Sequence, residues 1–121
     1  MSSIAIADPY INGDIFKMLG TLERCKLEIM LLSAKLTTDF IVEAAKFCKQ
    51  YPNFEVAVRK TSDFHDRFII IDKDRCWHIG ASIKDAGSKV FMISEVEDER
   101  NRVALGQIYE QGWAGGEKIF N

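Results

Sequence analysis

The run KLEIMLLSA, residues 26–34, constrains the fold most, because almost every position in it is apolar. A strand with one solvated face alternates apolar and polar residues, whereas a strand covered on both faces is apolar nearly throughout. We therefore expect a central strand with helices on each side of its sheet. A layered α/β domain is the simplest architecture that provides such a strand.

The segments around this run repeat a strand–helix pattern. IAIA is a short apolar run that ends at Asp8-Pro9, and NFEVAVRK alternates as a strand with one wetter face does. Apolar residues at helical spacing separate these strands. The predicted elements are strands at 4–7, 26–34 and 53–60, with helices at 12–24 and 38–51 between them.

The pattern changes after residue 64. RFIIID and RCWHIGAS flank the dipeptide Lys73-Asp74 and predict an antiparallel hairpin. KVFMISEV (89–96) predicts a further strand, and EDERNRVALGQIYEQ predicts a last helix that ends at GWAGG. We expect one α/β domain over 1–121 with a mixed sheet, helices on both of its faces and the order β-α-β-α-β-β-β-β-α.

The predicted hairpin brings polar residues together. A two-residue loop, or a four-residue loop with the same centre, would pair His65 with Ser82, Arg67 with Gly80 and Ile69 with His78. One interpretation is a phosphate site: the histidine attacks phosphorus, the guanidinium fork holds nonbridging oxygens and the hydroxyl adds a donor. The other is an ordinary solvated sheet face. The spacing alone leaves both open.

Composition excludes several classes of protein. The chain has 121 residues, of which 47% are hydrophobic and 28% are charged. This length and composition are typical of a single folded domain. A formal net charge of −2 provides no overall attraction to nucleic acid or to an anionic membrane. We expect no transmembrane segment, because no apolar run approaches about 18 residues.

The cysteines and histidines suggest neither disulfides nor metal. Cys25, Cys48 and Cys76 are odd in number and show no CxxC spacing, so we expect reduced thiols in a cytoplasmic protein. Two histidines without a cysteine pair fit no common ligand spacing. No metal or other cofactor is expected.

The block from residue 64 to 91 resembles a known signature. The order His65-x-Arg67-x4-Asp72, then Gly80-Ala81-Ser82-x-Lys84, is similar to the HxKx4Dx6GSxN motif of the phospholipase D superfamily. FHDRFIIID and WHIGASIKDAGSKVF resemble its small single-motif domains from bacteria and phages. DPYI near the start is also similar to the phospholipase-D-like domain that ends MIT-domain proteins.

The resemblance implies a role for each matching residue. His65 matches the nucleophilic histidine, Arg67 stands in place of the phosphate-binding lysine, and Asp72 matches the motif aspartate, which makes these three the implied catalytic residues. Arg67, Ser82 and Lys84 would contact the substrate. The chain departs from the motif in its arginine, in its longer gap before the glycine, and in Lys84, which replaces an asparagine.

The resemblance also implies a function. We expect a metal-independent phosphodiesterase, most plausibly a nuclease that forms a phosphohistidine at His65. Because a second histidine must protonate the leaving oxygen, a homodimer is implied; His78 as an internal second histidine is an alternative. A second hypothesis is a catalytically degenerate domain that binds nucleic acid or phospholipid headgroups or serves as an assembly module. A third is a protein that docks a partner through the acidic residues near its last helix, which are Glu95, Glu97, Asp98 and Glu99.

Overall fold

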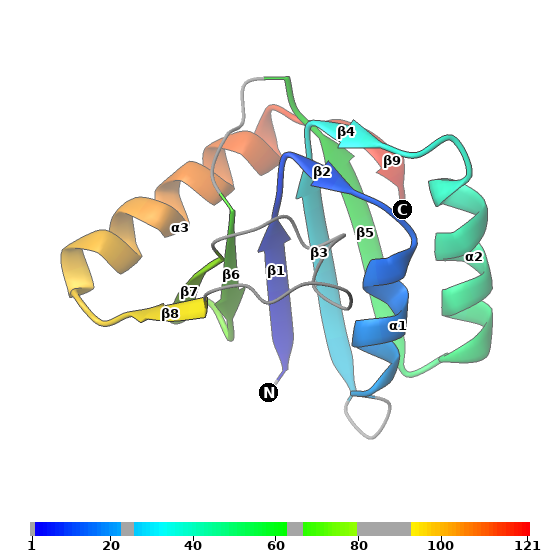
Figure 1. Ribbon diagram of the computed structural model, residues 1–121, viewed down its shortest axis with the longest axis horizontal. Helices are drawn as coiled ribbons and strands as arrows, with labels where there is room; N and C mark the ends of the chain where they lie inside the picture. The colour runs from blue at the N-terminus through cyan, green and yellow to red at the C-terminus, as the bar shows by residue number, and fades with distance from the viewer. Residues whose placement is uncertain (1, 23–25, 63–66, 80–92) are drawn as a thin grey trace.

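The computed structural model describes residues 2–22, 26–62, 67–79 and 93–121 (Figure 1). The strands of its main sheet are β1 (Ser3–Ala7), β3 (Leu27–Ser33), β5 (Phe54–Lys60), β6 (Phe68–Ile71), β7 (Arg75–Ile79), β8 (Ile93–Val96) and β9 (Glu117–Phe120). The helices are α1 (Asp14–Gly20), α2 (Phe40–Gln50) and α3 (Glu99–Ala114). A separate small sheet pairs β2 (Tyr10–Ile11) with β4 (Lys35–Leu36).

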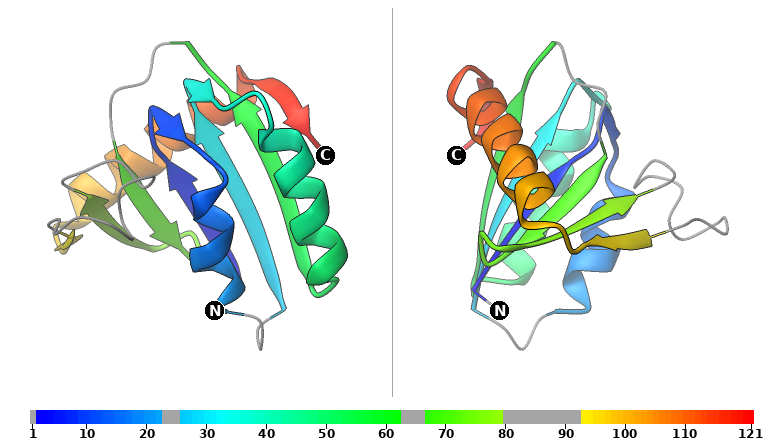
Figure 2. Two further views of the ribbon diagram at one scale, coloured as in Figure 1. Left: turned by 45° about the vertical axis from the view of Figure 1, so that its right-hand side comes forward. Right: turned by 90° about the vertical axis from the view of Figure 1, so that its left-hand side faces the viewer.

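The main sheet is mixed, with strand order β8-β7-β6-β1-β3-β5-β9. β1, β3 and β5 are parallel, β6 runs antiparallel to β1, and β9 runs antiparallel to β5. α1 and α2 cover one face and α3 crosses the other, so the domain has three layers (Figure 2). The predicted α/β class, the mixed sheet and the helices on both faces are confirmed.

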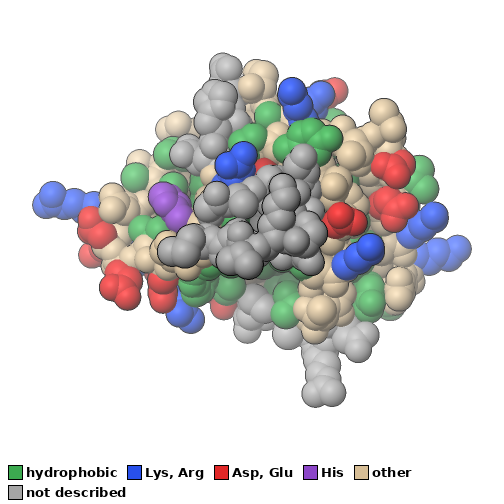
Figure 3. Space-filling view, in the orientation of Figure 1, with side chains coloured by type: hydrophobic (Ala, Val, Ile, Leu, Met, Phe, Trp, Pro, Cys, Tyr) green, Lys and Arg blue, Asp and Glu red, His purple; other side chains and the backbone are tan. Residues whose placement is uncertain are grey.

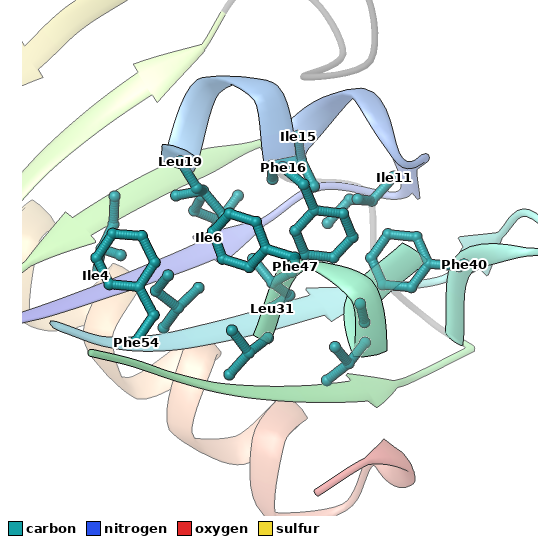
Figure 4. Close-up of a cluster of buried hydrophobic side chains, with 14 of the residues drawn as sticks. Ile4, Ile6, Ile11, Ile15, Phe16, Leu19, Leu31, Phe40, Phe47 and Phe54 are labelled. Carbon is teal, nitrogen blue, oxygen red and sulfur yellow. The ribbon is translucent and has the colours of Figure 1, made fainter. Parts of the chain in front are cut away.

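The larger core lies between the sheet and the pair α1 and α2 (Figure 4). Phe47 of α2 is at its centre, with ring centroids 5.0 Å from Phe16 and 5.5 Å from Phe54. Truncation of a buried aromatic residue of this kind to alanine costs about 3 to 5 kcal/mol. This packing fixes α1 and α2 over β1, β3 and β5.

The smaller core lies under α3. Tyr109 is buried between α3 and the sheet, and its hydroxyl donates to the Met30 carbonyl at 3.0 Å. Gly112 allows the close approach, because a Cβ there would lie 2.9 Å from Leu32 Cδ2. Burial raises the pKa of Tyr109 well above its ordinary range, so its phenol stays protonated and anchors the helix.

Two parts of the element prediction differ from the structure. α3 continues through Gly112 to Ala114, because this glycine packs against the sheet rather than ending the helix. The chain then returns as β9, an edge strand that the sequence analysis did not predict. Of the predicted strand at 89–96, only 93–96 lies within the described residues. No helix in the described part of the chain is long and apolar enough to cross a membrane.

Candidate functional site

Asp8 directly follows β1, the strand between β6 and β3, at its carboxyl end. The Asp8 side chain is fully buried, and its Oδ1 accepts a hydrogen bond from the Tyr10 N–H at 2.9 Å. The Asp8 N–H donates to the Leu32 carbonyl at 3.1 Å. Pro9 follows and cannot extend the strand ladder. These bonds fix a carboxylate at the edge where the three parallel strands end.

Arg67 brings a cation to this carboxylate. It directly precedes β6, and its carbonyl accepts from the Ile79 N–H at 3.1 Å. Its Nε lies 3.7 Å from Asp8 Oδ1, and its side chain is 39% exposed, whereas that of Asp8 is 0% exposed. Nε has no hydrogen-bond partner among the described residues. The guanidinium is therefore held at its inner end and open to solvent at its outer end, as anion binding requires.

Three of the predicted site residues, His65, Ser82 and Lys84, lie outside the described residues. His65 precedes Arg67 by two positions in the sequence. The structure thus places two of the five predicted residues, Arg67 and Asp72, and brings Arg67 together with Asp8.

Asp72 lies at the opposite end of β6 from Arg67. The two positions are five residue steps apart along an extended strand, which at about 3.3 Å per step puts them about 16 Å apart. Asp72 Oδ1 accepts from the N–H groups of Ser2 at 2.6 Å and Ser3 at 3.0 Å. The two backbone hydrogen bonds from Ser2 and Ser3 lower the pKa of Asp72. Asp72 therefore joins the hairpin to the start of β1, too far from Arg67 to share a phosphate with it.

The hairpin register differs from the prediction by one residue. The observed pairs are Phe68 with His78, Ile69 with Trp77, Ile70 with Cys76 and Ile71 with Arg75. Asp72 and Lys73 have φ values of 54° and 63°, and the Asp74 N–H donates to the Ile71 carbonyl at 3.1 Å. Positive φ at both central residues is typical of a tight hairpin turn. The turn is therefore centred on Asp72-Lys73, one position earlier than predicted, and Asp74 adds a residue before β7.

This register separates His78 from Arg67. His78 is opposite Phe68, whose side chain packs in the core under α3, and directly opposed residues point to the same face. Arg67 precedes Phe68 and alternates with it, so it belongs to the face that carries α1 and α2. This separation disfavours the alternative in which His78 serves as a second histidine of the same site.

Three solved structures are similar to this chain over nearly its whole length. The match to NucT from Helicobacter pylori covers 98% of this chain and 83% of the NucT chain, with a TM-score of 0.64 and 12% sequence identity. The match to Nuc from Salmonella typhimurium, a phospholipase D family member, covers 99% of this chain and 83% of the Nuc chain, with a TM-score of 0.61 and 16% sequence identity. The chain has a phospholipase D-like fold.

The third structure is TrmBL2, an archaeal chromatin protein with a novel mode of DNA binding. The match covers 98% of this chain but only 45% of the TrmBL2 chain, with a TM-score of 0.59 and 14% identity. No protein-family model and no curated protein sequence matches the chain.

Sequence reasoning about this phospholipase D-like domain missed Asp8 as a site residue. The signal was present: an aspartate directly after a buried strand, followed by proline, lies at the edge of the sheet where open α/β folds bind ligands. Among the described residues, no cluster of three or more His, Cys, Asp or Glu side chains is arranged to hold a metal. The chemistry available here is that of a guanidinium next to a buried carboxylate.

Cys48 and Cys76 are unpaired thiols in this domain. Burial is the main cause that raises the pKa of each, which disfavours the reactive thiolate. Cys25 lies outside the described residues. The two described cysteines therefore act as apolar packing residues.

Proposed function

We propose that this domain is a metal-independent phosphodiesterase that acts on nucleic acid through a phosphohistidine at His65. A ring nitrogen of His65 attacks phosphorus, the bond to the leaving oxygen breaks, and a second histidine protonates that oxygen. Water then attacks the phosphorus, the bond between phosphorus and the His65 nitrogen breaks, and the second histidine accepts the proton from the water. Arg67 binds the nonbridging oxygens throughout, and Ser82 and Lys84 add substrate contacts.

The observation that carries this proposal is the position of Arg67. Its guanidinium is partly exposed beside the fully buried Asp8, at the carboxyl edge of the parallel strands and two positions after His65. Arginine holds phosphate oxygens with two parallel donors, so it can replace the lysine of the superfamily motif. The similarity in fold to NucT and Nuc supports a reaction at phosphodiester bonds.

A homodimer supplies the second histidine in this proposal. The chain has only two histidines, and His78 lies on the other face of the sheet from Arg67. A twofold axis near His65 would put two copies of it at one phosphate and line the groove with two copies of Arg67.

The test is a cleavage assay with excess chelator present. Wild-type protein is incubated with single- and double-stranded DNA, with RNA and with bis(p-nitrophenyl) phosphate, and is compared with His65→Ala. We expect chelator-resistant hydrolysis that is lost in His65→Ala, and covalent labelling of the wild type when the reaction is quenched in base. Equal hydrolysis by both proteins, or none by the wild type, contradicts the proposal.

The second candidate is a domain that binds nucleic acid without turnover. The departures from the superfamily motif favour it, because Arg67 stands in place of a lysine and Lys84 in place of an asparagine. Acidic and basic side chains are interspersed among the described residues of one face (Figure 3). The similarity to TrmBL2 supports the same class of ligand. Under this hypothesis Arg67→Ala weakens DNA binding, His65→Ala leaves binding nearly intact, and no substrate is hydrolysed.

A further inference from the structure

A hollow lies on the same edge of the sheet as Arg67. A cavity of about 420 Å³ is present where β5 ends and β9 begins. Its polar lining is Lys35, Lys60, Thr61, Ser62 and Glu117. Lys35 and Lys60 are exposed, and the Thr61 N–H donates to the Ser33 carbonyl at 3.0 Å, which ties this loop to β3.

The cavity and Arg67 are aligned along the edge. Lys60 ends β5 two positions after Val58, which is buried under α1 and α2, so the period of two puts Lys60 on that same face. Arg67 belongs to this face as well. β1 and β3 lie between their strands, and three strand spacings of about 4.8 Å put the two positions about 14 Å apart.

This separation fits one nucleic-acid strand. It corresponds to about four nucleotides at the rise of about 3.4 Å per nucleotide in a duplex, and to fewer in an extended strand. Lysine ammonium groups bind backbone phosphates without regard to sequence, and hydroxyl groups such as those of Thr61 and Ser62 add donors. Two lysines against one glutamate, Glu117, leave the lining with one net positive charge.

We propose that the cavity at Lys35 and Lys60 is a second backbone site, which binds a phosphate a few nucleotides from the one held by Arg67. The inference rests on the proposed function, because it takes the phosphate at Arg67 as its reference point. It assigns a path: the strand runs along the carboxyl edge from β6 across β1 and β3 to β5. Substrates too short to span the edge do not use the second site.

The test compares a long ligand with a short one. Binding is followed by fluorescence anisotropy of a labelled single-stranded DNA of about 12 nucleotides, within usual site sizes. We expect Lys35→Ala and Lys60→Ala each to weaken binding about two- to fivefold, as exposed ion pairs do. Each variant should also reduce the magnitude of the slope of the logarithm of the association constant against the logarithm of the salt concentration by about 0.7. Hydrolysis of bis(p-nitrophenyl) phosphate should not change.

Three further variants make the test specific. Lys26→Ala and Lys49→Ala remove the same charge from exposed positions outside this cavity, and should leave the 12-nucleotide affinity near that of the wild type. Glu117→Gln removes the opposing carboxylate and should tighten binding.

The inference is overturned if Lys35→Ala and Lys60→Ala bind the 12-nucleotide DNA as tightly as the wild type, or lose no more affinity than the control variants. It is also overturned if the wild type does not bind this DNA. A wild type that fails to hydrolyse the small diester, yet binds long DNA through these lysines, rejects the proposed catalysis and supports the second backbone site.

Discussion

The two ends of the β1–β6 pair each hold an aspartate, and the two carboxylates are used differently. At the carboxyl end of β1, Asp8 is fully buried and lies 3.7 Å from the Nε of Arg67. At the amino end, Asp72 is exposed and its Oδ1 accepts from Ser2 and Ser3. Both accept backbone N–H groups, but of the two only Asp8 forms an ion pair with a guanidinium within the described part of the chain.

The difference separates a structural end of the sheet from a candidate functional end. The Asp72 carboxylate accepts backbone N–H groups, so it fixes the hairpin against β1. The Asp8 carboxylate orients Arg67, whose side chain is 39% exposed and can reach a ligand. The aspartate of the motif thus contacts the backbone of β1, while an aspartate from outside the motif lies beside Arg67.

The largest expected effect is at Arg67. Arg67→Ala should reduce kcat/KM for bis(p-nitrophenyl) phosphate about 10²- to 10³-fold, as loss of one preorganised donor does. Arg67→Lys keeps a cation beside Asp8 but loses the planar fork, so it should fall between the wild type and Arg67→Ala. Arg75→Ala is the control, because that arginine is 61% exposed and lies near the structural end. Equal losses in Arg67→Ala and Arg75→Ala would erase the distinction between the two ends.

Asp8→Ala tests the buried carboxylate. It leaves the Tyr10 N–H without the acceptor it has at 2.9 Å, and we expect the free energy of unfolding in urea to fall by about 1 to 3 kcal/mol. Asp8→Asn keeps an oxygen for that N–H and should lose less stability. Because each variant removes the charge that holds Arg67, both should also weaken phosphate binding. Binding as tight as that of the wild type would mean that Asp8 does not position Arg67.

Asp72→Asn should change stability but not chemistry. Backbone hydrogen bonds lower the folded-state pKa of Asp72 below its ordinary value of 3.8, so its stabilising effect is complete above that pH and disappears as the pH falls through the folded-state pKa. The variant should therefore have a lower Tm than the wild type at pH 7, with the gap closing below about pH 3.8. Asparagine accepts the positive φ of 54° here, so backbone strain does not confound the comparison.

The control for Asp72→Asn is Asp74→Asn, an exposed aspartate of the same turn, whose Tm should stay near that of the wild type. The rate per folded molecule should be unchanged in both variants. If Asp72→Asn is fully folded and still hydrolyses substrate more slowly than the wild type, Asp72 contributes to the reaction.

The smallest effect is expected for the Arg75–Glu95 ion pair between β7 and β8. The two side chains are 61% and 38% exposed, with 3.2 Å between their charged atoms. A double-mutant cycle of Arg75→Ala and Glu95→Ala should give a coupling of at most about 1 kcal/mol in the free energy of unfolding. A larger coupling would mean that exposed pairs also hold this hairpin, which would weaken the contrast with the buried carboxylate.

The hairpin shows where sequence reasoning succeeds and where it fails. The apolar alternation of RFIIID and RCWHI predicts two paired strands, and the structure confirms them as β6 and β7. The register was wrong by one residue, because the pattern does not reveal that Asp72 and Lys73 adopt positive φ. β9 was missed because EKIF is a short segment whose pairing depends on the free edge of β5.

The sequence by itself determined the layered α/β class, the central place of the run at 26–34 and the presence of Arg67 within a motif-like block. Such features follow from local periodicity and residue chemistry, which any short window contains. Only the tertiary structure decided that Asp8 lies beside Arg67 and that Asp72 does not. Contacts between residues almost sixty positions apart depend on strand order and register, which are set by packing of the whole sheet rather than by any one segment.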